Sequence, residues 1–94
     1  MAVKVMIPTP LRPFAERQAA IDVEGQTVGE ALDALTSQYG DLRRHLYGDG
    51  GQLRSFVNVY VNEEDIRDLQ KDLTPLRDGD TITIVPSIAG GSRD

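Results

Sequence analysis

Cysteine is absent from this chain of 94 residues. Without a thiol, the chain can form no disulfide, no thiolate metal site and no iron–sulfur centre, and it offers no cysteine nucleophile. Aromatic residues are also scarce, at 5% of the sequence. The chemistry of this protein must therefore depend on groups other than cysteine side chains.

Long apolar runs are missing as well. The apolar stretch over residues 3–7 is too short for a secretory signal, and prolines follow it at positions 8, 10 and 13. No run is long enough to span a bilayer as a helix. We therefore expect a cytoplasmic protein that does not enter a membrane.

Basic residues are outnumbered by acidic ones, ten to fifteen, so the formal net charge is −5. Nucleic acids and anionic membranes are bound through clustered lysines and arginines, which makes both poor candidates for partners. Basic surfaces on partner proteins are the natural counterparts. With 39% hydrophobic and 27% charged residues, the composition is that of one globular domain with a small core.

The first half of the chain predicts two strands and a helix. Apolar residues alternate over residues 3–7 and again over Gln18–Val23, while the proline-rich stretch Pro8–Pro13 between them is expected to be a loop. Thr27 and Glu30 have the spacing of a capping box, which predicts a helix start, and Gly40 is its expected end. The residues expected to face the core here are Val3, Val5, Ile7, Ala19, Ile21, Val23, Val28, Ala31, Leu32, Leu35 and Tyr39.

The second half predicts a short helical turn over Asp41–Leu46, a glycine-rich loop over Gly48–Gly51 and two further strands. Phe56–Val61 alternates with its valines on one face, and the last strand directs Ile82 and Ile84 inward. Between them, Asn62–Asp65 is expected to be a polar turn, and Ile66 is expected to start a short strand.

This order of elements predicts an α+β fold of the ubiquitin-like, or β-grasp, type, in which a mixed sheet wraps over one main helix. The final strand would lie beside the first, and Leu32 and Leu35 would pack against the sheet residues Val5, Val59 and Ile84. A ferredoxin-like sandwich is the alternative. It needs a second long helix, for which Arg67–Asp78 is a weak candidate because Pro75 interrupts it.

A diglycine, Gly90-Gly91, follows the last predicted strand, and only Ser92, Arg93 and Asp94 come after it. We expect residues 1–86 to form the domain and residues 87–94 to form a flexible tail. Paired glycines have no side chain to pack, so they suit a thin segment that enters the narrow active site of another protein. A frayed chain end is the alternative interpretation.

Other polar and aromatic residues have weaker functional interpretations. His45 has no histidine or cysteine nearby and is interpreted as exposed or locally hydrogen-bonded rather than catalytic. The Gly48–Gly51 loop lacks the residues of a phosphate-binding motif. The acidic residues lack the spacing of a calcium loop and are interpreted as a solvated face. This acidic series comprises Glu63, Glu64, Asp65, Asp68 and Asp72.

Phe56 and Tyr60 alternate with the valines of their strand, which places both on the sheet face away from the helix. An exposed aromatic pair near the tail could contact a partner enzyme. Cover by neighbouring loops is an equally good interpretation.

Three segments resemble the MoaD/ThiS family of ubiquitin-like sulfur carriers, and within it the cysteine-pathway carriers. These segments are the ending from Asp78-Gly79-Asp80 through Pro86 and Ile88 to Gly90-Gly91, the proline-rich stretch Ile7–Pro13, and the run Arg54–Arg67. The resemblance covers nearly the whole chain. It implies a carrier that acts as a co-substrate of partner enzymes, with no catalytic residue and no metal or cofactor of its own.

The resemblance also implies the reactions of the tail. A ubiquitin-activating-like enzyme would join AMP from ATP to the carboxylate of Gly91, and a sulfur donor would displace AMP to leave a thiocarboxylate. In the cysteine pathway, that sulfur adds to an aminoacrylate formed from activated serine on a pyridoxal-phosphate cysteine synthase, and a zinc metalloprotease later frees cysteine. ATP, zinc and pyridoxal phosphate therefore belong to the partners, and Ala89, Gly90 and Gly91 would enter their active sites.

In this sequence the Gly91 carboxyl is part of an amide bond to Ser92 and cannot be adenylated. The resemblance implies that a JAMM-type metalloprotease removes Ser92, Arg93 and Asp94, although the extension could instead block activation or be left over from cloning. A small subunit of molybdopterin synthase and a ubiquitin-like modifier joined to lysines remain alternative functions. A noncovalent adaptor that does not need its tail is a further one.

Overall fold

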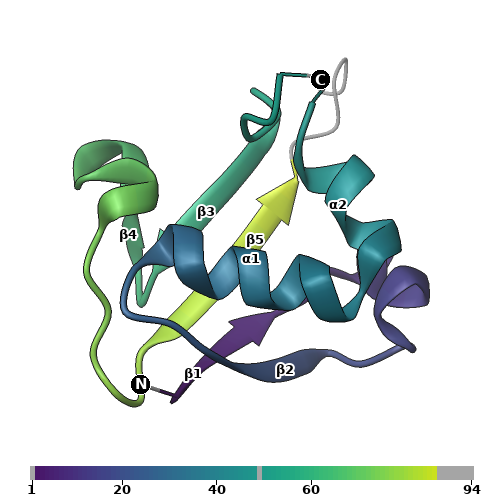
Figure 1. The fold of residues 1–94 in the computed structure, drawn as a ribbon, viewed down its shortest axis with the longest axis horizontal. Helices are drawn as coiled ribbons and strands as arrows, with labels where there is room; N and C mark the ends of the chain where they lie inside the picture. Colours follow the sequence, from purple (N-terminus) through teal and green to yellow (C-terminus); the bar gives the residue numbers. More distant parts are fainter. Residues whose placement is uncertain (1, 49, 87–94) are drawn as a thin grey trace.

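The computed structural model describes residues 2–48 and 50–86, and within them a five-stranded sheet with two helices on one face (Figure 1). The elements are β1 (Ala2–Met6), the 3-10 helix η1 (Thr9–Ala15), β2 (Ala20–Glu24), α1 (Val28–Gln38), α2 (Gly40–Leu46), β3 (Val57–Val61), β4 (Glu64–Asp65), the 3-10 helices η2 (Ile66–Asp68) and η3 (Lys71–Leu73), and β5 (Thr81–Pro86). No helix in these two ranges has the length and apolar character needed to cross a membrane.

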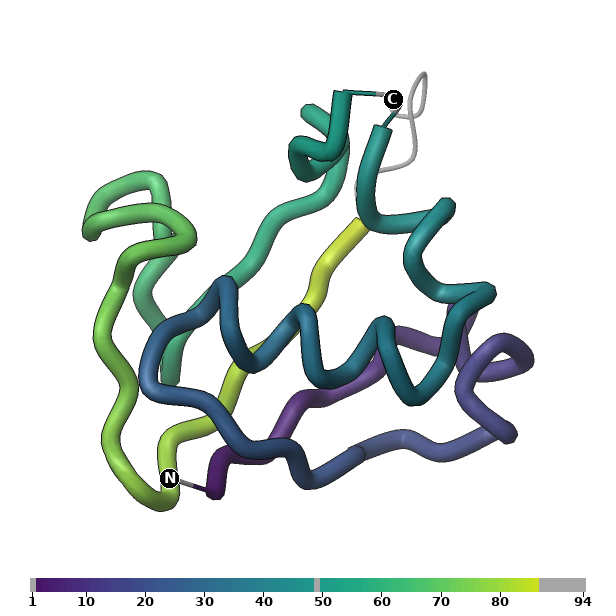
Figure 2. Tube along the Cα trace, in the orientation of Figure 1, coloured from purple at the N-terminus to yellow at the C-terminus, as the bar shows by residue number. Residues whose placement is uncertain are grey.

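The strands are ordered β2-β1-β5-β3-β4 across the sheet. β1 pairs antiparallel with β2, while β5 runs parallel to β1 and antiparallel to β3. Figure 2 traces how the last strand enters the sheet between the first hairpin and β3. The mixed sheet with its last strand beside its first is the predicted β-grasp arrangement, which is therefore confirmed.

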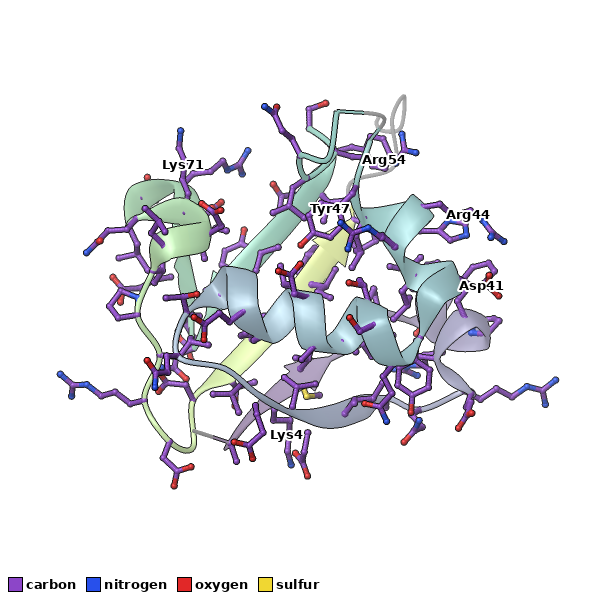
Figure 3. All side chains as sticks on the ribbon, in the orientation of Figure 1. Lys4, Asp41, Arg44, Tyr47, Arg54 and Lys71 are labelled. Atoms are coloured by element: carbon purple, nitrogen blue, oxygen red, sulfur yellow. The ribbon has the colours of Figure 1, made fainter. Side chains whose placement is uncertain are left out.

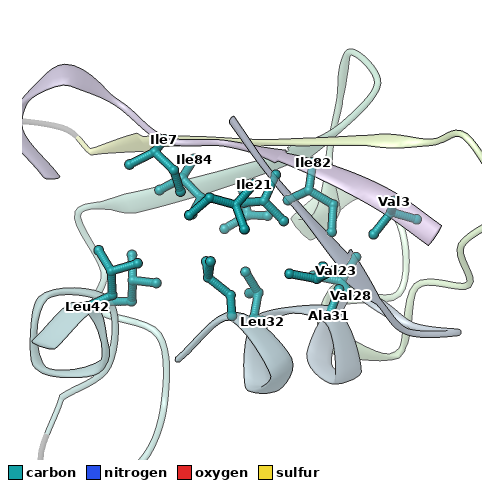
Figure 4. Close-up of a cluster of buried hydrophobic side chains, with 14 of the residues drawn as sticks. Val3, Ile7, Ile21, Val23, Val28, Ala31, Leu32, Leu42, Ile82 and Ile84 are labelled. Atoms are coloured by element: carbon teal, nitrogen blue, oxygen red, sulfur yellow. The ribbon is translucent and has the colours of Figure 1, made fainter. Parts of the chain in front are cut away.

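The core lies between the sheet and α1, because the strands alternate apolar and polar residues while α1 carries an apolar stripe. In Figure 4, Leu32 of α1 faces Ile21, Ile82 and Ile84 of the sheet. Leu35, Val5 and Ile82 are completely buried. The predicted packing of the α1 leucines against β1, β3 and β5 is confirmed.

Helix α1 begins as its sequence predicts. The backbone N–H of Glu30 donates to Oγ1 of Thr27 at 3.2 Å, which satisfies one of the free amides of the first turn. The Glu30 carboxylate also reaches back, but it accepts from the N–H of Gln26 at 2.9 Å, one residue before the position that a capping box uses.

Helix α1 ends at Gln38, close to the predicted stop at Gly40, but Gly40 does not lead into a loop: it begins α2. The break falls at Tyr39, whose backbone angles are φ −125° and ψ 82°. The Tyr39 hydroxyl accepts a hydrogen bond from Nε2 of Gln18 at 2.7 Å, so a tertiary contact holds this residue outside the helix. Two consecutive helices result, and α2 packs beside η1.

The stretch Pro8–Pro13, predicted to be a loop, contributes most of the 3-10 helix η1. Proline fixes φ near −65° and needs no N–H partner, so it suits the start of a short helical segment. Leu11 and Ala15 are buried there. Ala19, predicted to face the core, is exposed and precedes β2.

Two expectations after β3 need correction. Of the expected turn Asn62–Asp65, only Asn62 and Glu63 form a turn, in which Asn62 has φ 60°, whereas Glu64–Asp65 forms β4 by pairing with Tyr60 and Val61. Ile66 starts the 3-10 helix η2 rather than a strand, and its buried side chain draws the chain back over the core.

Arg67–Asp78 contains η2 and η3 but, within the part of the chain described, no second long helix. Residues 74–76 pair with the segment that leads into α1: the N–H of Val28 donates to the carbonyl of Thr74 at 3.0 Å, and the N–H of Leu76 donates to the carbonyl of Gln26 at 2.9 Å. The ferredoxin-like alternative is therefore excluded.

Candidate functional site

Strand β5 leads directly to the tail. It is hydrogen-bonded to β1 on one side and to β3 on the other, and it ends at Pro86 opposite Val57. A strand paired on both sides is a rigid support for whatever follows it. The predicted tail residues Ala89, Gly90 and Gly91 and the extension Ser92, Arg93 and Asp94 lie outside the described residues, so their roles remain predictions.

Two large apolar side chains are exposed beside the end of β5. Phe56, which immediately precedes β3, is 40% exposed, and Val85 of β5 is 41% exposed. Val85 lies opposite Asn58 and alternates with the buried Ile82 and Ile84, so its side chain belongs to the face away from α1, whereas Phe56 lies in the turn just before β3. The guanidinium of Arg54 lies 6.0 Å from the centre of the Phe56 ring. We call Phe56 and Val85 the tail-root patch.

Tyr60, the second predicted partner contact, is half-buried and lies opposite Thr83 of β5 and Asp65 of β4. Tyr60 lies four positions after Phe56, which corresponds to roughly 13 Å along a strand. The structure therefore places Tyr60 on the strand as predicted, puts Phe56 in the turn before the strand, and does not bring the two rings together. Val85 takes the place beside Phe56, and its outward position could have been read from its alternation with the buried Ile82 and Ile84.

Arg67, in η2, connects β4 to β3 through hydrogen bonds of its side chain. Its guanidinium donates to the Asp65 carboxylate at 2.8 Å and to Oδ1 of Asn58 at 2.6 Å. Hydrogen bonds from the Arg67 side chain and backbone hold the pKa of Asp65 below its ordinary value. Asp65 is thus paired, and its interpretation as part of a solvated acidic face is wrong, whereas Glu63, Glu64, Asp68 and Asp72 are exposed as expected.

A cleft opens on the helix side of the sheet, bounded by both helices, the segment 51–55, β3 and the η2–η3 turns, with a volume of about 690 Å³. Figure 3 shows Tyr47 and Arg54 close together near the end of α2, with Lys71 on the η3 turn. The apolar lining comprises Leu32, Leu53, Val57, Val59 and Ile66. The charged lining comprises Asp33, Arg43, Arg54, Asp65, Arg67, Lys71 and Asp72.

Tyr47 lies at the centre of the charged part of the cleft. Burial raises the pKa of its hydroxyl, and the carboxylates of Asp33 and Asp72 raise it further. The guanidinium of Arg43 stacks over the Tyr47 ring at 5.1 Å and lies 3.9 Å from Asp33. The hydroxyl therefore remains a proton donor across the physiological range.

His45 differs from its interpretation as exposed or locally hydrogen-bonded. Its ring stacks on Phe14 of η1, with ring centres 4.1 Å apart, and its Nε2 atom is buried without a hydrogen-bond partner among the described residues. The packing of η1 against α2 explains this position, which only the tertiary fold creates. Among the described residues, no three acidic or histidine side chains lie together as a metal site would require. The Gly48–Gly51 segment forms a turn in which Gly51 donates to the carbonyl of Gly48 at 3.0 Å.

Comparison with known proteins places this geometry in a family. The ThiS family model matches residues 5–91. The sulfur carrier protein CysO of Mycobacterium tuberculosis is 40% identical over 93 residues, covering 97% of this chain and all of the relative. Small archaeal modifier protein 1 of Haloferax volcanii is 34% identical over 76 residues, covering 80% of this chain and 83% of the relative.

Solved structures agree. CysO in the crystal structure of the Amycolatopsis orientalis BexX/CysO complex superimposes with a TM-score of 0.86 at 38% identity, covering 95% of this chain and 99% of that one. The fold, the sequence match and the unbroken coverage confirm the resemblance described above. The chain belongs to the ThiS family of ubiquitin-like proteins.

Proposed function

We propose that this chain is a sulfur carrier. Cleavage behind Gly91 exposes the terminal carboxylate, which is then adenylated and converted to a thiocarboxylate that donates sulfur in the biosynthesis of cysteine or a related sulfur metabolite. The observation that carries this proposal is the family match, which ends at Gly91, the second glycine of the pair. The alignment of this chain with the sulfur carrier CysO also spans the whole length of CysO.

The chemistry follows from the terminal carboxylate. A carboxylate is a poor acyl donor, so ATP first converts it to an acyl adenylate with release of pyrophosphate. A sulfide donor then forms a carbon–sulfur bond and AMP leaves, which yields a thiocarboxylate. The chain supplies the acyl group and the recognition surface, while the adenylating enzyme, the JAMM-type peptidase and the pyridoxal-phosphate cysteine synthase supply the catalysis.

The tail-root patch is the proposed contact for the adenylating enzyme. Phe56 and Val85 are exposed beside the end of β5, so a partner that covers them would hold the tail at a fixed distance from its own active site. Relatives of this fold are bound by other proteins, as the BexX/CysO complex illustrates.

The test is to prepare a chain that ends at Gly91 and incubate it with ATP, a cognate adenylating enzyme and sulfide. Intact-mass analysis is expected to detect the replacement of one terminal oxygen by sulfur. The chain ending at Asp94 is the matched control, and it should remain unmodified until a peptidase removes the extension. An unmodified Gly91 form in a reaction that thiolates a known carrier would contradict the proposal.

A protein modifier is the second candidate function, because small archaeal modifier protein 1 matches four fifths of the chain. The same acyl adenylate would then be attacked by a lysine amine of a target protein, and an isopeptide bond would replace the carbon–sulfur bond. Mass analysis of adducts in cells that express the Gly91 form distinguishes the two: a ladder of isopeptide-linked targets favours the modifier, and a thiocarboxylate favours the carrier.

A further inference from the structure

The end of α2 borders a pocket whose charged lining, among the residues described, is entirely basic. This pocket has a volume of about 430 Å³, and Arg43, Arg44, Tyr47 and Arg54 line it together with three glycines. In Figure 3, Arg44, Tyr47 and Arg54 lie around this end of α2. We call the four side chains the arginine pocket. They bring three positive charges together on a chain whose formal net charge is −5.

The contacts of these arginines leave guanidinium donors available to a ligand. Nε and Nη2 of Arg54 donate to the backbone carbonyl of Arg44 at 3.0 and 2.9 Å, which ties the segment 51–55 to α2. Nη1 of Arg44 donates to Asp41 at 3.0 Å. No described residue accepts from Nη1 of Arg54 or from Nη2 of Arg44. The side chains of Arg43 and Arg44 are more than half exposed, so a bound anion can reach their N–H groups.

Tyr47 connects the arginine pocket to the larger cleft, since it lines both. Burial and then the carboxylates of Asp33 and Asp72 raise the pKa of its hydroxyl, and both carboxylates line the cleft but not the pocket. Leu53, which pairs with Tyr47 in an isolated β-bridge, belongs to the apolar lining of the cleft. A carboxylate bound at the arginines would therefore lie next to an apolar surface.

The chemistry of these groups favours carboxylates on a protein over other anions. A guanidinium binds a carboxylate or a phosphate through two parallel hydrogen bonds, and arginine and tyrosine are enriched in protein–protein contacts. Inorganic phosphate or the backbone of a nucleic acid would use only the basic part and leave the adjoining apolar lining uncovered. A protein segment supplies both carboxylates and apolar side chains. The rest of the chain is acidic and repels such a segment, which restricts it to this position.

We propose that the arginine pocket binds an acidic segment of a partner protein. Carboxylates of that segment pair with Arg43, Arg44 and Arg54. The Tyr47 hydroxyl donates to one of these carboxylates, and an apolar side chain beside them packs on Leu53 in the cleft. This binding does not depend on whether the tail carries sulfur.

The test is an amide NMR titration of the full chain with the synthetic peptide acetyl-Glu-Glu-Leu-Glu-Glu-Leu-amide. We expect the amides of Arg44, Tyr47 and Leu53 to shift, while that of Val3, near the end marked N in Figure 2, stays in place. The affinity should decrease as the ionic strength rises, because salt screens exposed ion pairs. The same peptide with glutamine at every glutamate position is the matched probe and should bind about tenfold more weakly. Serine in place of both leucines should also weaken binding, because the apolar contact is lost.

Substitutions assign the binding to the proposed groups. Arg44→Glu should weaken it about tenfold, and the fold should persist because the Arg44 side chain contacts only the exposed Asp41 among the described residues. Arg44→Lys keeps the charge and should retain most of the affinity. Tyr47→Phe keeps the ring and should weaken binding about threefold through the loss of one donor. Arg77→Glu is the matched control, because it makes the same charge change at an exposed residue that lines neither cavity.

Several results would overturn the proposal. The pocket amides might be expected to shift and instead stay in place, or the glutamine peptide could bind as well as the acidic one. Equal weakening by Arg44→Glu and Arg77→Glu would mean a general charge effect. Equal binding of inorganic phosphate or of an oligodeoxythymidylate at the same amides would identify an anion site without selectivity for protein. Pocket shifts that grow with protein concentration before peptide is added would mean that a second copy occupies the pocket. None of these measurements uses the adenylating enzyme, so they are separate from the test of sulfur transfer.

Discussion

Phe56 shows how a single side chain can be assigned to folding or to recognition. It precedes β3, is 40% exposed, and touches the guanidinium of Arg54 rather than the core. Its replacement should therefore leave the domain folded. The same side chain, next to Val85 at the end of β5, is well placed for contact with a protein that receives the tail.

Phe56→Glu is expected to weaken binding of the adenylating enzyme by at least fivefold, because a carboxylate would be desolvated at an apolar contact. Calorimetric titration of the Gly91 form with that enzyme measures the change. Leu73→Glu is the matched control, since Leu73 is 68% exposed but lies on η3, away from the tail root. Unfolding of the Phe56 variant would assign the ring to the core, and unchanged binding would remove it from the interface.

The pairing of Asp65 with Arg67 makes the stability of the folded domain depend on pH. Because its pKa is held below the ordinary value by hydrogen bonds from Arg67, the ionised form is favoured in the folded state. The resulting stabilisation is present above the ordinary pKa of about 4. It is lost as the pH falls through the lower folded value.

Melting temperatures measured from pH 7 downward should therefore fall less steeply below about pH 4 for Asp65→Asn than for the native chain. The variant should be the less stable of the two near neutrality, and the difference should shrink in acid. Asp68→Asn is the control, because Asp68 is exposed and receives no side-chain hydrogen bond from Arg67. Parallel melting curves for Asp65→Asn and the native chain would contradict the assigned role.

At the scale of elements, α1 is the best case of local determination. Its cap and its apolar stripe can both be read from a stretch of about a dozen residues, and the structure has the helix where they indicate. The boundary with α2 could not be read in this way, because Tyr39 is held by Gln18, a residue far away in the sequence. β4 is similar, since two polar residues become a strand only through pairing with Tyr60 and Val61.

Thr27→Ala is expected to lower the free energy of unfolding by about 1 kcal/mol, because the N–H of Glu30 loses its acceptor. Urea denaturation followed by circular dichroism measures this difference. Thr27→Ser keeps the hydroxyl and should retain most of the stability. Equal midpoints for the alanine and serine variants would mean that the cap contributes nothing.

At the scale of the whole molecule, the important feature is the central position of β5 in the sheet. The last strand is inserted between β1 and β3, so the sheet cannot be completed until the end of the chain is in place. The strand that precedes the proposed reactive terminus in the sequence thus lies in the middle of the sheet. The tail-root patch lies beside the end of that strand, and the cleft lies on the helix side of the sheet. The patch is suited to contact with the partner enzyme proposed above.

The sequence alone was sufficient for the strands β1, β3 and β5, for the start of α1 and for the β-grasp order, because alternation and helical periodicity are local properties that the core then reinforces. It also marked Gly90-Gly91, whose proposed role depends on having no side chains. Only the tertiary structure placed Val85 beside Phe56, separated Phe56 from Tyr60, stacked His45 on Phe14 and opened the cleft around Tyr47. Each of these arrangements joins residues from different elements, and their distances depend on strand register and helix packing, which no local pattern of residues records.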